Sequence, residues 1–220
     1  MNSAHIIDFW KWFSRFNDVF KLLHRLPFES ADFWENQLLT QLNTVHKCPW
    51  QIDFEWHING TTEMIFTAKR RMSFFHIIEQ LVGQAPPLPG WNFQALYPPR
   101  QPDHNIRERF GDTCIDPNEL WLAPTSITQV GGGKYLLEIY AELYDPALIS
   151  HRKAIDAVLF NILGERSIAT DIARFEVKWV FCLSPDERNK LLPLKSLPAI
   201  MYRLKEPRPP ITITHDQVLK

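Results

Sequence analysis

The strongest structural signal in the chain is an alternating segment that ends in a tight-turn dipeptide. In Trp50–Ile58 every second residue is large and apolar, and the residues between are polar or charged. This period of two predicts a half-buried antiparallel strand. Asn59–Gly60 follows directly and is a preferred hairpin turn, so Thr62–Thr67 is the expected return strand. The fold must therefore accommodate at least one antiparallel strand pair.

Further strands are expected in the second half of the chain. Leu120–Val130 and Tyr135–Leu143 flank the glycine run Gly131–Gly133, which predicts a second hairpin. Trp91–Tyr97 and Phe175–Leu183 also alternate and predict two short additional strands. We found no internal repeat of fixed period.

Amphipathic helices are predicted where apolar residues recur at steps of three and four, in residues 3–25, Asp32–Lys47, Ser73–Val82 and Pro146–Leu163. Asp32 and Glu35 have the spacing of a capping box at the start of the second helix. Asp145 followed by Pro146 is typical of a helix start, and Gly164 is the expected stop of that last helix.

Helices before, between and after two hairpins, without strict strand–helix alternation, predict an α+β fold. We expect a mainly antiparallel sheet with helices packed on one face. At 220 residues the chain is within single-domain size, and no polar linker divides it. Residues 1–220 are therefore expected to form a single domain, in which an N-terminal helical hairpin (about 3–47) packs on an α+β body.

Composition restricts the classes of partner and compartment. The net charge is −1, so the basic excess of a general nucleic-acid binder is missing, and no nucleic-acid partner is expected. No apolar run is long enough for a transmembrane helix, so no membrane partner is expected. The three cysteines, Cys48, Cys114 and Cys182, are odd in number and far apart, which favours free thiols in the cytosol. The strand-like surroundings of Cys182 predict a core position.

No constellation of metal ligands or catalytic residues is visible. His46 and Cys48 match zinc spacing only weakly, so no metal site and no cofactor are predicted. Pro98–Pro117 is polar and irregular, and we expect a long surface loop that contains Cys114. The basic cluster Lys69–Arg70–Arg71 is expected to be a solvated turn, with contact to an acidic partner as the alternative.

Glu165 is the one charged residue in an unusual predicted place. Directly after Gly164 it would lie beside the unpaired carbonyl groups at the negative end of the helix dipole. That placement requires compensation, by Arg166, Arg174, backbone amides or a ligand. Glu165 is therefore the best single candidate for a binding residue.

Two short motifs carry a resemblance. The motifs are Ala85–Pro86 followed by Gly90–Trp91, and Leu163–Gly164–Glu165. Together they resemble a pattern in an uncharacterised family of bacterial hypothetical proteins of unknown function. The likeness spans about residues 50–183. It implies a compact bacterial domain, carries no known activity, and singles out Glu165 and Trp91.

Two functions from different classes remain open. The first is a non-enzymatic interaction or binding protein of the bacterial cytosol, with another protein as its partner. The alternative is a small hydrolase or ligand-binding domain whose site combines Glu165, Trp91, His57 and the 98–117 loop, so whether the chain is an enzyme is left open. A deep pocket with converging polar groups would favour the second function, and a flat apolar patch the first.

Overall fold

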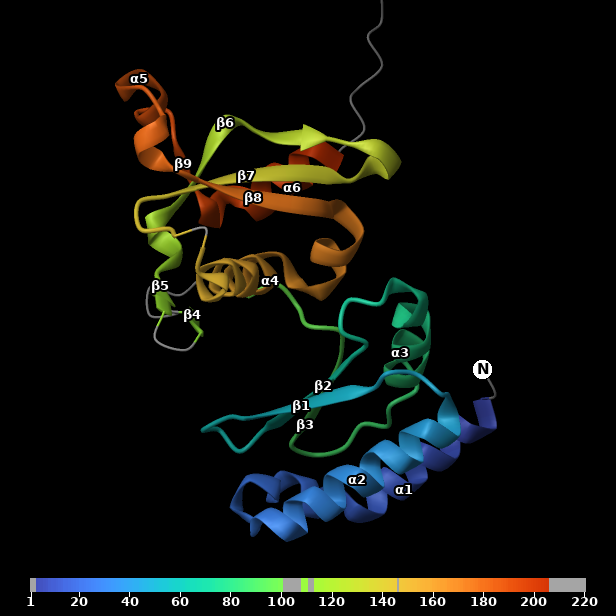
Figure 1. Ribbon diagram of the computed structural model, residues 1–220. Helices are drawn as coiled ribbons and strands as arrows, with labels where there is room; N and C mark the ends of the chain where they lie inside the picture. Colours follow the sequence, from blue (N-terminus) through green and yellow to red (C-terminus); the bar gives the residue numbers. More distant parts are fainter. Residues whose placement is uncertain (1–2, 101–107, 111–112, 146, 206–220) are drawn as a thin grey trace, which may run out of the picture.

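The computed structural model describes residues 3–100, 108–110, 113–145 and 147–205. It consists of two halves, and one long helix of the C-terminal half lies at the junction between them (Figure 1). The N-terminal half contains α1 (Ser3–Lys21), α2 (Phe28–Val45), β1 (Gln51–Trp56), β2 (Thr62–Thr67), α3 (Phe75–Val82) and β3 (Trp91–Ala95). The C-terminal half contains β6 (Leu120–Gln129), β7 (Tyr135–Ala141), α4 (Ile149–Asp171), β8 (Ile172–Trp179), α5 (Pro185–Arg188), β9 (Leu192–Pro193) and α6 (Leu197–Lys205). A short ribbon of β4 (Glu108–Phe110) and β5 (Thr113–Ile115) connects them and contacts α4. The predicted α+β class is confirmed.

The N-terminal sheet has the strand order β1-β2-β3 and one apolar face. β1 and β2 form the predicted hairpin in antiparallel register, with Gln51 opposite Thr67 and Trp56 opposite Thr62. β3 pairs with β2 in parallel, because α3 and the proline-rich segment after it return the chain to the same end of the sheet. The carboxyl ends of β2 and β3 therefore lie side by side, and so do the loops that follow them.

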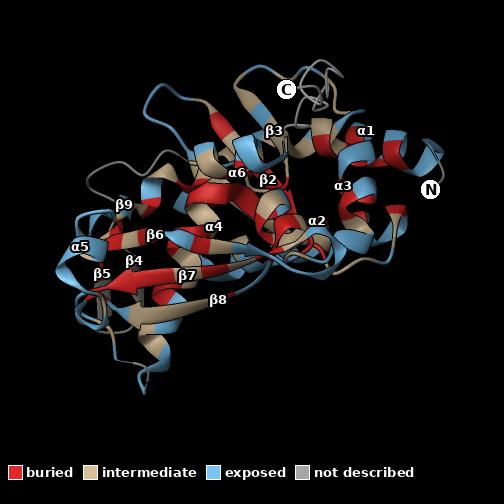
Figure 2. Ribbon diagram, turned by 90° about the horizontal axis from the view of Figure 1, so that it is seen from above, coloured by how far each residue is buried: buried red, intermediate tan, exposed pale blue. Residues whose placement is uncertain are grey.

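An aromatic core lies between that apolar face and the first three helices. Phe9, Phe13 and Phe20 of α1 are fully buried in this core, where Phe9 contacts Phe66 of β2, and each such ring contributes about 1.5–3 kcal/mol. The Trp10 indole Nε1 donates to the carbonyl of Leu81 in α3 at 2.9 Å, so its one polar atom has a partner. Buried residues recur along α1 and α2 at the spacing that the predicted amphipathic pattern requires, and Figure 2 shows buried and exposed residues alternating along α1.

The C-terminal sheet has the order β8-β7-β6-β9 and buries a second apolar core. β6 and β7 form the second predicted hairpin, with an irregular register between Leu122 and Ile127. β7 and β8 are parallel, because α4 crosses from the end of one to the start of the other. Val158, Ile162 and Met201 from α4 and α6 pack on this sheet. α4 lies between this sheet and the N-terminal half (Figure 1).

Two predicted helix starts were wrong. α2 begins at Phe28, directly after Pro27, so Asp32 lies inside the helix and accepts a hydrogen bond from Asn36 instead of capping an end. α4 begins at Ile149, because the Asp145 carboxylate accepts from the backbone of Ala147 and forms a turn before the helix. Pro146 lies outside the described residues.

Two further expectations were wrong at the ends of β8. The strand begins three residues earlier than predicted and ends at Trp179. Cys182 then lies in a short 3-10 turn and is exposed, because the alternating pattern continues past the last paired residue. The expected loop 98–117 contains the paired strands β4 and β5, while its residues 101–107 and 111–112 fall outside the described chain.

Candidate functional site

The predicted stop at Gly164 is a break inside α4, after which the helix resumes. Gly164 has φ 73° and ψ 166°, a conformation outside the helical region, and helical residues continue to Asp171. A β-carbon at Gly164 would lie 2.7 Å from the Pro99 nitrogen and 2.9 Å from the Tyr97 carbonyl oxygen. Only glycine permits both this backbone conformation and this close approach of the two halves.

Glu165 directly follows the end of the first helical segment of α4, as the sequence predicted. Because the helix resumes after Gly164, Glu165 opens the second helical segment and points into the junction between the halves. It is completely buried, and its backbone N–H donates to the Tyr97 carbonyl at 2.9 Å. Of the predicted compensating groups, backbone amides are the ones that bond Glu165, whereas Arg166 pairs with Glu79 of α3.

The Glu165 carboxylate accepts three hydrogen bonds from the N-terminal half. Oε1 accepts from the Thr67 hydroxyl at 2.7 Å and from the Arg70 backbone N–H at 2.8 Å, and Oε2 accepts from the Tyr97 backbone N–H at 3.3 Å. Thr67 is the last residue of β2, and Arg70 and Tyr97 lie in the loops that follow β2 and β3. One carboxylate therefore joins α4 to both loops.

The backbone at these loops is strained. Among the described residues, the non-glycine residues with positive φ are Lys69 (53°), Arg70 (65°) and Leu96 (62°). The Arg70 N–H donates to Glu165, and Lys69 directly precedes it. Leu96 directly precedes Tyr97, whose N–H also donates to Glu165. Such left-handed residues cost about 1–2 kcal/mol each, so they persist where surrounding contacts hold them. Glu165 supplies such contacts on both loops.

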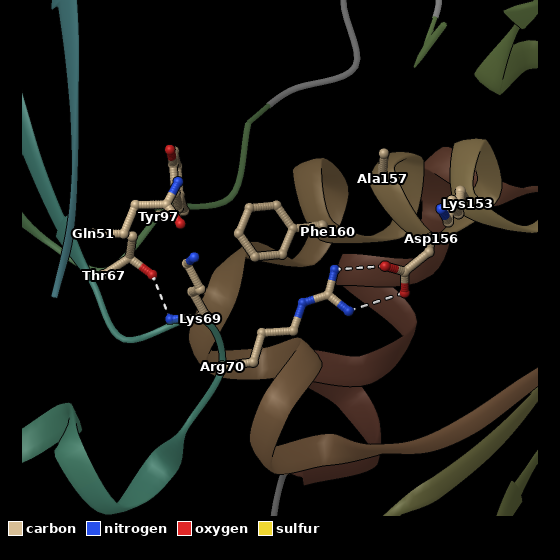
Figure 3. Close-up of a pocket in the computed structure, with 9 residues that line it drawn as sticks. All are labelled: Gln51, Thr67, Lys69, Arg70, Tyr97, Lys153, Asp156, Ala157 and Phe160. Carbon is tan, nitrogen blue, oxygen red and sulfur yellow. Dashed lines mark hydrogen bonds and ion pairs between the residues drawn. The ribbon is translucent and has the colours of Figure 1, made fainter. Parts of the chain in front are cut away.

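A pocket of about 460 Å³ opens beside this carboxylate, and we call it the junction pocket (Figure 3). Its lining comes from β1, from the loops after β2 and β3, and from α4: Gln51, Thr67, Lys69, Arg70, Tyr97, Lys153, Asp156, Ala157 and Phe160. Polar and charged groups thus converge from both halves on one cavity.

The charged groups of the junction pocket fall into two sets. The Arg70 guanidinium donates two hydrogen bonds to the Asp156 carboxylate, at 3.0 and 2.8 Å, and lies 4.8 Å from the centre of the Phe160 ring. Lys69 and Lys153 are exposed, and within the described ranges neither amine has an ion-pair or hydrogen-bond partner. Burial raises the pKa of nearby Asp53, and Lys69 lowers it only in part.

Trp91 and His57 lie at the other end of the N-terminal sheet. β2 is six residues long, so its ends are roughly 17 Å apart. Trp91 starts β3, where its indole Nε1 donates to Asn17 at 3.2 Å and its ring packs on Phe13. The structure therefore does not bring Trp91 or His57 together with Glu165, and a binding role for Trp91 stays a separate prediction.

His57 belongs instead to a group that the sequence reasoning missed. The ligand atoms of Glu55, His57 and Glu63 lie within 4.8 Å of one another, an arrangement that could hold a metal ion. Each carboxylate already has a partner, Arg100 for Glu55 and Asn92 for Glu63. Arg100 offsets the charge of Glu55, whereas Asn92 is a neutral donor that only hydrogen-bonds Glu63, and we assign no metal to the group.

Comparison with protein-family models, curated proteins and solved structures gave no match for this chain. The resemblance carried by Gly90–Trp91 and Gly164–Glu165 therefore stays a prediction. Both glycines have clear physical roles: Gly90 has φ 74° and its carbonyl accepts from Thr62, while Gly164 permits the contact between the halves. In the part of the chain that the structure describes, no helix is both long and apolar enough to cross a membrane.

Proposed function

We propose that this protein binds a small molecule in the junction pocket and that Glu165 shapes the site without touching the ligand. The proposal is the ligand-binding alternative predicted from the sequence, with the site moved from Trp91 to the loops after β2 and β3. One observation carries it: Lys69, Arg70 and Leu96 adopt left-handed conformations around the Glu165 carboxylate, at the wall of a cavity. Strain of this kind concentrates at binding sites.

The choice of residues at these turns supports a binding role over a purely structural one. At the other positive-φ positions of the described residues the chain has glycine, as at Gly60, Gly90 and Gly132. Glycine at Lys69 would remove the strain, but it would also remove the amine from the pocket. Retention of a long cationic side chain at a strained position indicates that the side chain is needed there.

The arrangement favours binding over catalysis. Among the described lining residues, Thr67 is the only one with an aliphatic hydroxyl group. Its proton is directed to Glu165, while its oxygen accepts from the Lys69 backbone N–H at 3.0 Å. Both interactions hold the turn, so this hydroxyl is not poised to attack a substrate. We therefore propose a binding protein and assign no catalytic residue.

A steric block tests this proposal. Ala157→Phe places a ring in the pocket, whereas Ala199→Phe adds the same ring at an exposed site on α6. In a thermal-shift screen of a metabolite library, at least one compound should stabilise the parent and Ala199→Phe but not Ala157→Phe. Compounds that stabilise all three proteins equally, or a library without any stabilising compound, would contradict the proposal.

A second candidate function rests on a different surface. Leu143, Trp179 and Phe181 are 79%, 50% and 64% exposed and line one shallow apolar depression at the ends of β7 and β8. Clustered exposed apolar side chains are typical of protein-binding surfaces. The Leu143→Ser/Phe181→Ser variant should lose a protein partner that the parent captures. Capture that survives both changes would reject this surface.

The proposed setting is the cytosol. Cys48 and Cys182 are free thiols, which a reducing compartment maintains. Secretion into the medium with an oxidised, disulfide-linked thiol would contradict this location.

A further inference from the structure

The charges of the junction pocket are not balanced. Arg70 and Asp156 neutralise each other through two hydrogen bonds, so neither is available to a ligand without breaking that pair. Lys69 and Lys153 then leave two positive charges on the lining itself. Of the two carboxyl groups nearby, Glu165 is engaged by three hydrogen bonds, and burial, which raises the pKa of Asp53, disfavours its charged form. Free ammonium groups on the wall of a cavity select for anions, because an anion there gains from both charges.

The rest of the lining is apolar and partly aromatic. The Tyr97 and Phe160 rings meet edge to face, with centroids 5.2 Å apart, and the Arg70 guanidinium lies over the Phe160 ring. Ala157, one turn before Phe160 on α4, leaves room beside this aromatic pair. In Figure 3 the Lys69 side chain extends toward the Phe160 ring, so the charge and the aromatic surface border the same space.

The volume limits the size of the occupant. At about 460 Å³ the pocket is within the usual range for small ligands, roughly 300–1,000 Å³. A single inorganic ion would leave most of this apolar lining in contact with water, and a macromolecule would not enter.

We infer that the ligand of the junction pocket is a small organic anion with a planar apolar body. Its acid group pairs with the Lys69 and Lys153 amines, and its planar part packs beside Phe160 and Tyr97. The inference rests on the proposed function, because it names the class of ligand for the same site. The Lys69 backbone is preorganised beside the pocket, since its N–H is held by Thr67 and the neighbouring amide by Glu165.

Three probes separate the two parts of this chemistry. 2-Naphthoate carries a carboxylate on a planar apolar body, 2-naphthylmethanol has the same body without the charge, and inorganic phosphate has charge without the body. Isothermal titration at low ionic strength should give 2-naphthoate the highest affinity, roughly three- to tenfold above the alcohol. High salt should reduce this preference.

Matched variants assign the preference to the two lysines. Lys69→Met/Lys153→Met keeps most of each side chain's bulk and should bring 2-naphthoate down to the affinity of the alcohol. Lys195→Met, at an exposed lysine remote from the lining, should change neither affinity. Both lysines of the pocket are exposed, so the double variant is expected to fold.

The outcomes distinguish this inference from the proposed function. The anion inference would be overturned if the parent bound 2-naphthoate and 2-naphthylmethanol equally, or bound phosphate most tightly. It would also be overturned if the preference for 2-naphthoate survived the double variant, or if no probe bound. If the anion preference fails but the alcohol binds the parent and Ala157→Phe abolishes that binding, the proposed pocket stands. Binding of both naphthyl probes that Ala157→Phe leaves unchanged would overturn the pocket itself.

Discussion

The Glu165 carboxylate is the contact whose removal should reveal most about the junction. In Glu165→Gln one acceptor oxygen remains for Thr67 and Arg70, while the other becomes an amide that faces the Tyr97 N–H, donor against donor. Because Glu165 is completely buried, the stranded donor cannot turn to water. A buried unsatisfied group and the loss of charge-assisted bonds should cost about 1–3 kcal/mol of unfolding free energy.

Urea unfolding measures this cost directly. With a slope of about 2 kcal/mol per molar urea, the midpoint of Glu165→Gln should fall by about 0.5–1.5 M at unchanged slope. Glu142→Gln, at an exposed glutamate, is the matched control and should stay within about 0.5 kcal/mol of the parent. A midpoint of Glu165→Gln at or above that of the parent would refute the role of Glu165 as the link between the halves.

Three further predictions concern the backbone, the cores and the thiols. Gly164→Ala should lower the unfolding free energy by about 2–4 kcal/mol through backbone strain and the clash with Pro99. Gly131→Ala, where nothing lies within 4 Å of the added carbon, should not lower it. Equal urea midpoints of the two variants would contradict this prediction. The chain should unfold in one calorimetric transition, because Glu165 and Arg70 tie the two cores together; two resolved transitions would show independent halves. At pH 8 iodoacetamide should modify exposed Cys182 but hardly Cys48, since burial raises the pKa of Cys48 to about 11; comparable labelling by peptide mass spectrometry would contradict this.

Local patterns in the sequence predicted most of the strands. Thr62–Thr67 has the bounds expected from the Asn59–Gly60 turn, and the second hairpin turns at the glycine run as predicted. Alternation and turn chemistry are local properties, so they survive folding with little change. The helix starts were less predictable, because Asp145 and Asp32 can cap a turn or bind a neighbouring side chain as readily as they cap a helix.

The candidate site could be predicted only in part. Glu165 was singled out because a glutamate after a helix-ending glycine needs compensation, and the compensation comes from backbone amides of residues far away in the sequence. Nothing in the sequence indicated that the loops after β2 and β3 would meet at this carboxylate, because the parallel pairing of those strands is a tertiary property. Lys69–Arg70 had the pattern of a solvated turn, and its strained conformation is visible only in the structure.

An NMR titration tests the central claim, a ligand site at the junction pocket, most directly. Amide shifts of 15N-labelled protein would be followed as 2-naphthoate is added to saturation. The largest changes are predicted at Lys69–Arg71, at Tyr97 and at Asp156–Phe160, with none at Trp91. Changes confined to the surface of Leu143, Trp179 and Phe181 would contradict the junction pocket as the site and would instead favour the apolar surface at the ends of β7 and β8.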